Sequence, residues 1–377
     1  MRLRWRTAGE SHGVGLVAFI DGICSGVAIR NEDIARDLQM RRSGAGRSPR
    51  QQQETDEFQL LAGVRNGLTT GAPIAVLVPN KVMGSDGFAS RAEGTNQPPR
   101  TVPRPGHADL AGALKRPGLD LHDVAERASA RETAARTVAG AIAAALLHEC
   151  DIRVKTRVVQ IGDVVAEGKA AEPAPDTPYG TGDKKAETRI DASVKEAESR
   201  QVALGGIFEV IVENVPSGLG DYTQWDLRLD GRLAQALMSI PAVKAVEIGE
   251  GREMAVADSS RARDPIRRKG SGLVRTSNLA GGIEGGVSNG MPITARVWLK
   301  PIPGVAAPVE SVDLATGKPA QADAERHDVC VLRAAAVVGR AMTALVLADA
   351  LLDRTGGDTL TQVKRSLKQL RDDVTLG

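Results

Sequence analysis

The sequence predicts one α+β domain that spans residues 1–377. Stretches with the period of two that is typical of strands alternate along the chain with stretches of helical period. Composition stays the same on both sides of every loop, and no internal repeat is visible. A length of 377 residues allows one large domain or two, so the uniform composition decides for one.

Apolar spacing and turn residues give the order of the elements. Strands are predicted at 2–7, 14–20, 74–78, 153–165, 208–212, 242–248 and 293–299. Helices are predicted at 31–42, 130–147, 227–239, 333–352 and 359–370. Two segments rich in Gly, Pro and polar residues, 81–105 and 166–190, are predicted to be surface loops.

The first predicted helix places an arginine on its buried side. Ile34, Leu38 and Arg41 are spaced four and three apart, so they share one face of the helix. Arg41 is therefore predicted to point inward.

The start of the Ala-rich helix at 130–147 is predicted from Ser129 and Glu132, which have the spacing of a capping box. Capping alone explains Ser129. A helix N-terminus is also an anion site, and Arg127 and Arg131 lie on either side of this serine. We therefore predict that a phosphate or carboxylate binds there.

Composition excludes several classes of protein. The cysteines Cys24, Cys150 and Cys330 lie far apart, which excludes a disulfide scaffold and a cysteine-based zinc module. We expect no transmembrane span, since no apolar run approaches about 20 residues. We expect no signal peptide, since the basic start has no apolar core behind it. A soluble, cytoplasmic protein is predicted.

Arginines gather in two segments, 41–50 and 261–269, of a chain whose net charge is only +2. An RNA-binding protein is one interpretation, and it predicts strongly salt-dependent affinity. Bases stack on aromatic side chains, and the chain has nine of them (three Trp, two Tyr and four Phe). The near-neutral charge and the scarce aromatics count against this alternative.

Among five histidines, His12 and His107 are the candidates for chemistry. Each lies on a predicted loop beside a glycine, where a ligand can approach closely. Neither has the His-x-x-x-His or carboxylate spacing of a metal site, so acid–base work is favoured and no metal is expected. His122 and His148 are predicted to lie on the surface.

These residues predict an enzyme that acts on a small polyanion. Arginine rather than lysine at 41, 47, 104, 127 and 131 suits a bidentate grip on oxyanions. The glycine loop 281–286 lacks the spacing of a dinucleotide fold, and no Walker lysine motif or Gly-x-Ser-x-Gly elbow occurs. The residues alone do not specify the reaction.

Five ordered motifs resemble the chorismate synthase family, and the likeness covers nearly the whole chain. They are Thr7–Gly13 (TAGESHG), Arg104–Asp109 (RPGHAD), Glu126–Ala134 (ERASARETA), Gly281–Pro292 (GGIEGGVSNGMP) and Arg326–Asp328 with Cys330 and Arg333. The resemblance implies a single-domain β-α-β sandwich, usually a homotetramer. It also implies conversion of 5-enolpyruvylshikimate 3-phosphate to chorismate and phosphate with reduced FMN.

That reaction is a 1,4-elimination in which phosphate and proton leave from opposite faces, and the reduced flavin is thought to lend an electron and take it back. By resemblance, His12 protonates the leaving phosphate, His107 lies against the anionic flavin, and Asp328 accepts a proton near flavin N5. Ser11 and Ser129 support these proton paths.

The resemblance also assigns the binding residues. The substrate's phosphate and carboxylates are held by Arg41, Arg47, Arg104, Arg131 and Arg333. Flavin contacts come from Arg127, Ala128, Ser129, Pro241, Ala242, Gly285, Lys300, Pro301, Ile302, Pro303, Gly304 and Arg326. Reduced flavin comes from a separate reductase or another source, because NADPH-driven flavin reduction belongs to only some members and nothing in this sequence indicates it.

Several positions depart from the family pattern, and none removes a predicted proton donor or phosphate ligand. They are Arg116-Pro117, Val329, Arg340, Gly304 and Lys81-Val82. An active enzyme is predicted, with the change at Gly304 bearing on flavin affinity. The alternative is a catalytically inert relative that binds flavin or phosphorylated ligands; His12, His107 and Asp328 argue against it.

Overall fold

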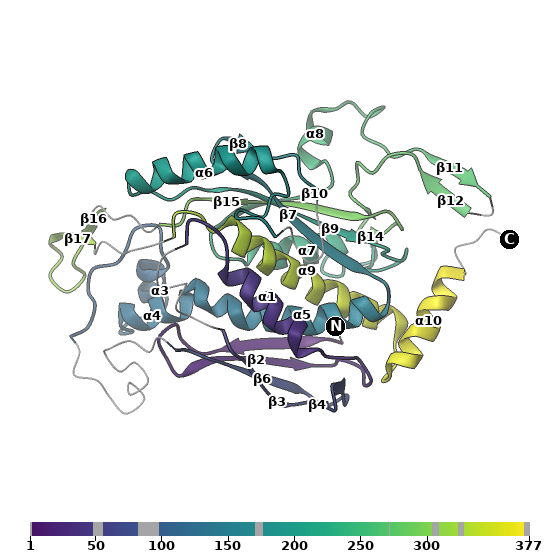
Figure 1. The fold of residues 1–377 in the computed structure, drawn as a ribbon, viewed down its shortest axis with the longest axis horizontal. Coiled ribbons are helices and arrows are strands. Elements are labelled where there is room, and N and C mark those ends of the chain that lie inside the picture. The colour runs from purple at the N-terminus through teal and green to yellow at the C-terminus, as the bar shows by residue number, and fades with distance from the viewer. Residues whose placement is uncertain are drawn as a thin grey trace.

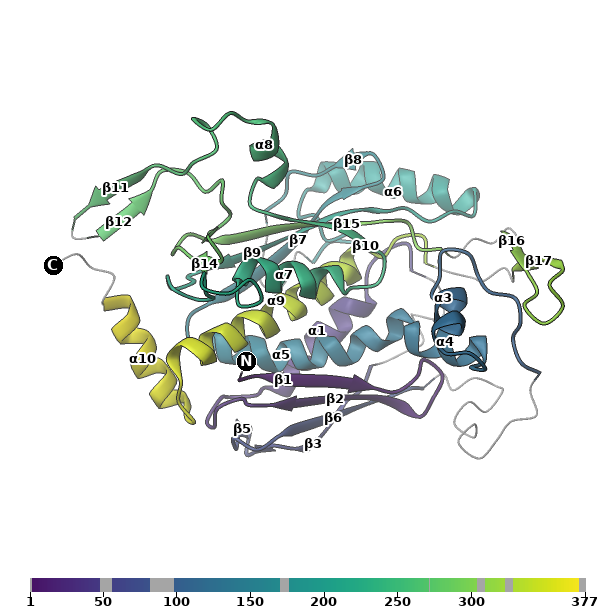
Figure 2. The ribbon, with the colours of Figure 1, turned by 180° about the vertical axis from the view of Figure 1, so that it is seen from behind.

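The computed structural model describes residues 2–47, 56–81, 98–169, 176–270, 272–303, 309–322 and 328–372. Two antiparallel sheets enclose a layer of helices, which Figure 1 and, from behind, Figure 2 show. This arrangement confirms the predicted α+β class and the β-α-β sandwich.

The first sheet has four strands in the order β1-β2-β6-β3. They are β1 (Arg4–Ala8), β2 (Gly15–Asp21), β6 (Ile74–Pro79) and β3 (Gln59–Ala62). Leu16, Ala18 and Ile20 of β2 are fully buried while Phe19 is 43% exposed. The alternation along β2 sends one face to the helices and the other outward.

The second sheet has five strands in the order β10-β15-β9-β7-β8. They are β7 (Arg153–Ile161), β8 (Val164–Val165), β9 (Gly206–Glu213), β10 (Val243–Ile248) and β15 (Ile293–Leu299). Its inner face contributes buried side chains such as Phe208 and Val297. Its other face carries a network of charges in which Glu209 pairs with Arg157 at 2.8 Å and Arg296 at 3.2 Å.

Four of the described helices fill the space between the sheets. They are α1 (Asn31–Arg42), α5 (Thr133–Glu149), α7 (Leu229–Met238) and α9 (Leu332–Thr355). The contact between α5 and α9 is close enough to require glycine, because a Cβ on Gly140 would lie 2.2 Å from that of Ala341. Ile34, Leu38 and Arg41 of α1 are buried as predicted.

The remaining helices and hairpins lie around this sandwich. The helices are α3 (Asp109–Lys115), α4 (Leu121–Ala128), the 3-10 turn η2 (Ala130–Glu132), α6 (Lys184–Ser199), α8 (Gly251–Val256) and α10 (Leu360–Asp372). The hairpins are β4 (Val64–Arg65) with β5 (Leu68–Thr69), β11 (Ile266–Lys269) with β12 (Gly272–Arg275), β13 (Ile283–Glu284) with β14 (Val287–Ser288), and β16 (Val309–Val312) with β17 (Pro319–Ala322).

The predicted loop at 166–190 was too long at its end. α6 begins at Lys184, because the Asp183 side chain accepts from the backbone N–H groups of Lys185 and Ala186 and caps the helix. Ile190 and Val194 then bury its inner side. The predicted loop at 81–105 falls largely on residues 82–97, which lie outside the described residues, and 98–105 form no helix or strand.

α9 corrects the expectation that no segment is apolar enough to span a membrane. It is long and apolar enough by composition, but 94% of its most apolar window is buried inside the protein. It is the central helix of the sandwich, in contact with α5, β7 and β9. Arg333 and Arg340 interrupt the apolar run in the sequence, and both are buried.

Candidate active site

The loop that bears His12, residues 9–13, connects β1 to β2 and is clamped by the end of α4. The His12 backbone N–H donates to Glu126 Oε2 at 2.7 Å, and His12 Nδ1 lies 2.6 Å from Glu126 Oε1. The loop begins at Gly9 with φ +102°, where a Cβ would lie 2.2 Å from the Gly15 oxygen. Only glycine fits this turn.

Arg127 and Asn80 hold the same loop from two other directions. Arg127 donates to the carbonyl and the hydroxyl of Thr7 at 3.0 and 2.9 Å, and to the Gly9 carbonyl at 3.3 Å. Asn80 Nδ2 donates to the carbonyls of Glu10 and Gly13, each at 2.9 Å. The guanidinium that the resemblance assigns to the flavin therefore also fixes the His12 loop.

Ser11 and Ser129 lie next to each other. The Ser129 hydroxyl donates to the Ser11 hydroxyl at 3.2 Å. Ser129 caps the 3-10 turn η2 rather than α5 itself, accepting from the Arg131 backbone N–H at 3.3 Å. Glu132 does not complete the predicted capping box; its carboxylate accepts from Thr7 Oγ1 at 2.5 Å and Arg136 Nε at 2.8 Å.

Arg41 and Arg131 share one buried carboxylate, that of Asp56. Arg41 Nη2 lies 3.1 Å from Asp56 Oδ2, Arg131 Nη1 bonds Asp56 Oδ1, and the Asp56 side chain is 0% exposed. Burial raises the Asp56 pKa, but the two guanidiniums outweigh it and the pKa lies below its usual value. Burial lowers the Arg41 pKa, Asp56 opposes this, and the positive charges of Arg131 and Arg47 add to it. The arginine stays charged, because a guanidinium is not deprotonated in proteins.

The positive charge of Arg47 lies close enough to Arg41 to lower the Arg41 pKa, and Arg47 pairs with Asp328 at 2.8 Å. The Val329 backbone N–H donates to the Gly46 carbonyl at 2.8 Å. Proline, usual in the family at 329, has no N–H to make this bond.

Arg333 meets the Thr177 carbonyl at 2.7 Å and Asp176 at 2.9 Å. The Asp176 side chain is 97% exposed whereas that of Arg333 is 10% exposed. The Nε atoms of Arg333, Arg41 and Arg47 are buried and have no hydrogen-bond partner among the described residues. Buried donors without partners are costly, so these three suit an anionic ligand.

The second histidine loop is internally bonded. Arg104 donates to Asp109 through its backbone N–H at 3.1 Å, Nε at 2.7 Å and Nη2 at 3.0 Å. His107 Nδ1 lies 2.5 Å from Asp109 Oδ1. Burial raises the Asp109 pKa, but the bonds from His107 and Arg104 outweigh it, and the pKa lies well below its usual value.

Part of the predicted flavin segment lies against this loop. Lys300 Nζ donates to the Gly106 carbonyl at 3.0 Å, and the Lys300 backbone N–H donates to the Ala242 carbonyl at 3.0 Å. Ala242, which follows Pro241, has φ +68°, a left-handed conformation unusual for alanine. Lys300 and the hydroxyl of Ser129 suit an anionic cofactor. Gly304, Arg326 and His327 lie outside the described residues.

Within one chain, Gly285 does not lie beside Lys300, Gly106 and Ala242. It lies in the turn between β13 and β14 with φ +60°, and that hairpin borders the start of β15 through the bond from the Thr294 N–H to the Gly281 carbonyl. Lys300 follows the other end of β15, roughly 20 Å of strand away.

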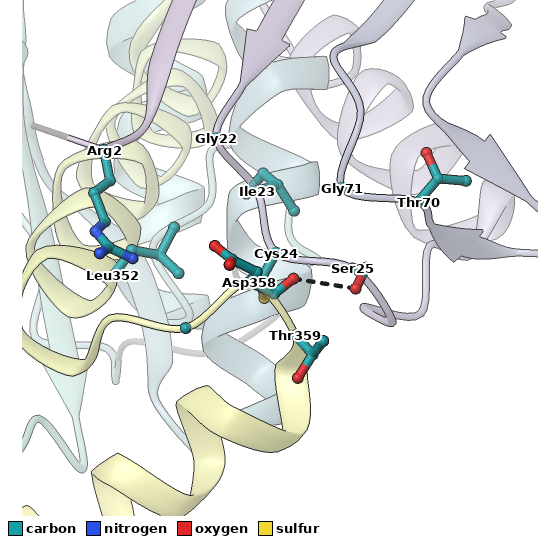
Figure 3. A pocket seen from close by; sticks show the side chains of 11 residues that line it. Arg2, Gly22, Ile23, Cys24, Ser25, Thr70, Gly71, Leu352, Asp358 and Thr359 are labelled. Carbon is teal, nitrogen blue, oxygen red and sulfur yellow. Dashed lines mark hydrogen bonds between the residues drawn. The ribbon is translucent and has the colours of Figure 1, made fainter.

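Two cavities lie outside the histidine and arginine groups. One of about 540 Å³ lies between the start of β1 and the α9–α10 connection, where Figure 3 shows Arg2, Cys24 and Asp358. It is at the opposite end of the β1–β2 hairpin from His12 and holds none of the predicted residues. A second, of about 500 Å³, includes Pro301 beside Trp298.

Sequence reasoning missed four residues that organise the site: Asp56, Asn80, Asp109 and Glu126. Asp109 stands inside the quoted RPGHAD motif, so its proximity to His107 was a usable signal. Glu126 immediately precedes Arg127, but nothing in the spacing connects it to His12. Among the other histidines, His148 is exposed as predicted, and His122 is half-buried. No group of three possible metal ligands occurs among the described residues.

Comparison with known proteins decides the family. A sequence profile for chorismate synthase matches residues 3–352. The chain belongs to the chorismate synthase family. The chorismate synthase of Moorella thermoacetica is 47% identical over 98% of both chains, and that of Carboxydothermus hydrogenoformans 45% over 98% of this chain and 99% of its own. A crystal structure of chorismate synthase is 36% identical and superposes with a TM-score of 0.77 over 99% of this chain and 98% of its own.

Membership gives the chain its activity. Chorismate synthases remove phosphate from 5-enolpyruvylshikimate 3-phosphate to form chorismate, in the shikimate pathway of aromatic amino acid biosynthesis, and they require reduced FMN. The chain is thus a lyase that eliminates phosphate. Its unusual Arg340 is buried and donates to Asp37 at 2.6 Å, which ties α9 to α1 instead of entering the site.

Proposed function

We propose that Arg41, Arg47 and Arg131 form the main anion-binding centre of this chorismate synthase. Three guanidiniums come close in a buried region, and the Nε atoms of Arg41 and Arg47 have no partner among the described residues. This is the observation that carries the proposal, because a phosphate or carboxylate supplies the missing acceptors. Arg104 and Arg333 hold the remaining acidic groups of the substrate.

His12 is the proton donor to the departing phosphate. Its backbone and its Nδ1 are fixed by Glu126, so Nε2 is the ring nitrogen left to give a proton. Proton donation to a leaving group from a fixed imidazole contributes about 10²–10⁴-fold to a rate. Ser11 and Ser129, which bond to each other, extend the proton path.

His107 and Lys300 face the cofactor, with Ala128, Ser129, Pro241, Ala242 and 301–304 completing its surroundings. When bound there, reduced FMN would supply the electron chemistry of the elimination, an electron lent to the substrate and taken back. Asp328 accepts the proton that the substrate loses. Arg47, paired with Asp328 at 2.8 Å, orients that carboxylate. Arg326 is a further contact for the flavin; Gly285, which lies near the other end of β15, would reach a flavin only from a second copy of the chain in the homotetramer.

The chain forms one domain and assembles as a homotetramer in the cytoplasm. Buried residues from Leu3 to Leu367 belong to one hydrophobic cluster, which supports a single domain. The outer face of the first sheet supports self-association, because Phe19 and Leu61 are 43% and 57% exposed on it and Figure 2 places the helices on its other side. Reduced flavin is supplied by a separate reductase or another source.

The decisive experiment is an anaerobic assay with dithionite-reduced FMN and 5-enolpyruvylshikimate 3-phosphate. Chorismate absorbance and free phosphate are expected to rise together in equal amounts. His12→Ala and His107→Ala are each expected to lower turnover about 10²–10⁴-fold, whereas His148→Ala, an exposed control, leaves it unchanged. Flavin binding without product would instead identify a catalytically inert relative.

A further inference from the structure

The two site histidines share a feature that the proposed roles do not require. Each ring meets a carboxylate through the same nitrogen: Nδ1 of His12 lies 2.6 Å from Glu126 and Nδ1 of His107 lies 2.5 Å from Asp109. The rings are only 28% and 21% exposed, and the carboxylates 12% and 0%. Such short contacts in partly buried surroundings fix which ring nitrogen carries the proton.

At His12 the carboxylate takes two bonds from one residue. Glu126 Oε2 accepts from the His12 backbone N–H, a group that can only donate, and Glu126 Oε1 faces His12 Nδ1. A carboxylic acid is ordinarily a stronger acid than an imidazolium. The shared proton therefore resides on Nδ1, and Glu126 accepts through both oxygens.

At His107 the geometry admits one assignment. Arg104 Nη2 lies 3.1 Å from His107 Nδ1, a distance that alone suggests donation to a bare ring nitrogen. Both nitrogens, however, also lie within bonding distance of Asp109 Oδ1, at 3.0 and 2.5 Å. An ionised carboxylate only accepts, and a bare Nδ1 at 2.5 Å from it would set two lone pairs against each other. Both nitrogens donate to Oδ1, and their closeness follows from sharing it.

We propose that Glu126 and Asp109 are positioning residues that hold His12 and His107 as Nδ1–H tautomers, so that both rings present Nε2 to the bound ligands. The placement of the protons stands on the contacts alone. Its consequence for turnover rests on the proposed role of His12 as proton donor. A donating His12 is then an imidazolium with Nδ1–H on Glu126 and Nε2–H toward the phosphate.

Replacing Glu126 by glutamine reverses the tautomer without changing the shape of the side chain. The amide oxygen of Glu126→Gln can still accept from the His12 backbone N–H. Its amide nitrogen then faces Nδ1 and can only donate. Nδ1 must become the acceptor, and the ring proton moves to Nε2. The imidazolium form is disfavoured as well, because two donors would then face each other.

The test is nitrogen NMR of histidine-labelled, substrate-free protein near pH 8, where the long-range correlations of each ring show which nitrogen bears hydrogen. With five histidines, single substitutions assign the signals. We expect bare Nε2 and protonated Nδ1 for His12 and His107, and a reversal at His12 alone in Glu126→Gln. Glu253→Gln, an exposed change on α8, is the control. Protonated Nε2 at both rings of the unaltered protein, or an unchanged His12 in Glu126→Gln, would overturn the proposal.

Measurements of turnover distinguish a failure of this proposal from a failure of the proposed role of His12. Glu126→Gln is expected to lower kcat about 10²–10⁴-fold, with the KM for substrate changed less than about threefold, because the lost interaction acts in the transition state. Glu126→Asp, which keeps the charge, is expected to recover part of the loss. A reversed tautomer with unchanged kcat would retain the placement of the protons and refute His12 as the donor. If Asp109→Asn folds, His107 alone should change its tautomer.

Discussion

His107 takes its carboxylate from Asp109, two residues along the chain, whereas His12 takes its carboxylate from Glu126, 114 residues away. The His107 loop supplies the carboxylate of Asp109 from within its own residues and holds it with Arg104. The His12 loop depends on α4 and Asn80 being packed in place. A histidine–carboxylate pair between near neighbours in sequence is positioned mainly by the local backbone. A pair between distant residues is positioned only as well as the fold around it is packed.

The largest effect that sharpens this comparison is expected from Asp56→Asn. The Asp56 carboxylate pairs with both Arg41 and Arg131. It therefore connects α1 to the 3-10 turn η2, which follows α4 in the chain. Neutralising it removes the buried counter-charge that the two guanidiniums share, which costs about 3–5 kcal/mol. The midpoint of urea unfolding should fall accordingly. The exposed change Asp176→Asn is the control, and an equal loss there would contradict the role of burial.

Acid should lower the stability contributed by Asp56 and by Asp109 alike. Asp56 and Asp109 have folded-state pKa values below their usual one. Their stabilisation is fully present above about pH 4, the ordinary pKa of an aspartate. It is lost as the pH falls below that value toward the lowered pKa, because the unfolded chain binds protons first. The melting temperature, measured from pH 6 to pH 2.5, should drop steeply below pH 4, and less steeply in Asp56→Asn.

Asn80→Ala is expected to loosen the His12 loop and to leave the His107 loop unchanged. The change removes the donor to the Glu10 and Gly13 carbonyls and the acceptor for Arg131 Nε at 3.0 Å. We expect a loss of about 1–3 kcal/mol. Amide exchange should quicken in residues 9–13, while residues 104–109 keep their protection. Equal quickening in both loops would show that they are not held independently.

Lys300→Met should produce the smallest change, confined to the His107 side. One hydrogen bond, from Nζ to the Gly106 carbonyl, is lost, worth about 0.5–1.5 kcal/mol. The methionine keeps most of the apolar stem. Flavin titration should show weaker binding, with the unfolding midpoint almost unmoved. Unchanged flavin affinity would remove Lys300 from the proposed cofactor contacts.

The sequence predicted local structure best where a short repeat of apolar residues determines it. Alternation predicted β1, and the spacing of Ile34, Leu38 and Arg41 placed that arginine inside the protein. Ser129 and Arg131 were correctly placed at a helix start, although η2 precedes α5 there. No helix was predicted where α6 lies, because its charged composition masks the stripe of Ala186, Ile190 and Val194.

The organisation of the site was less accessible for a physical reason. Glu126 and Asn80 act on a loop more than 60 residues from either of them, at distances set by packing rather than by spacing. Asp56 lies on a segment with no periodic pattern, and its role appears only when two helices bring their arginines to it. The family motifs identified the chemistry, but the carboxylates that orient it required the fold.

The position of α9 in the chain bears on how the protein is made. Every strand described precedes it, yet it is the helix against which β7, β9 and α5 pack. During synthesis β7 and β9 therefore emerge, at about 5–20 residues per second, before the helix that packs on them. That last helix of the layer arrives only with residues 332–355. Until then the side chains of β7, β9 and α5 that pack on α9 lack that cover in the nascent chain.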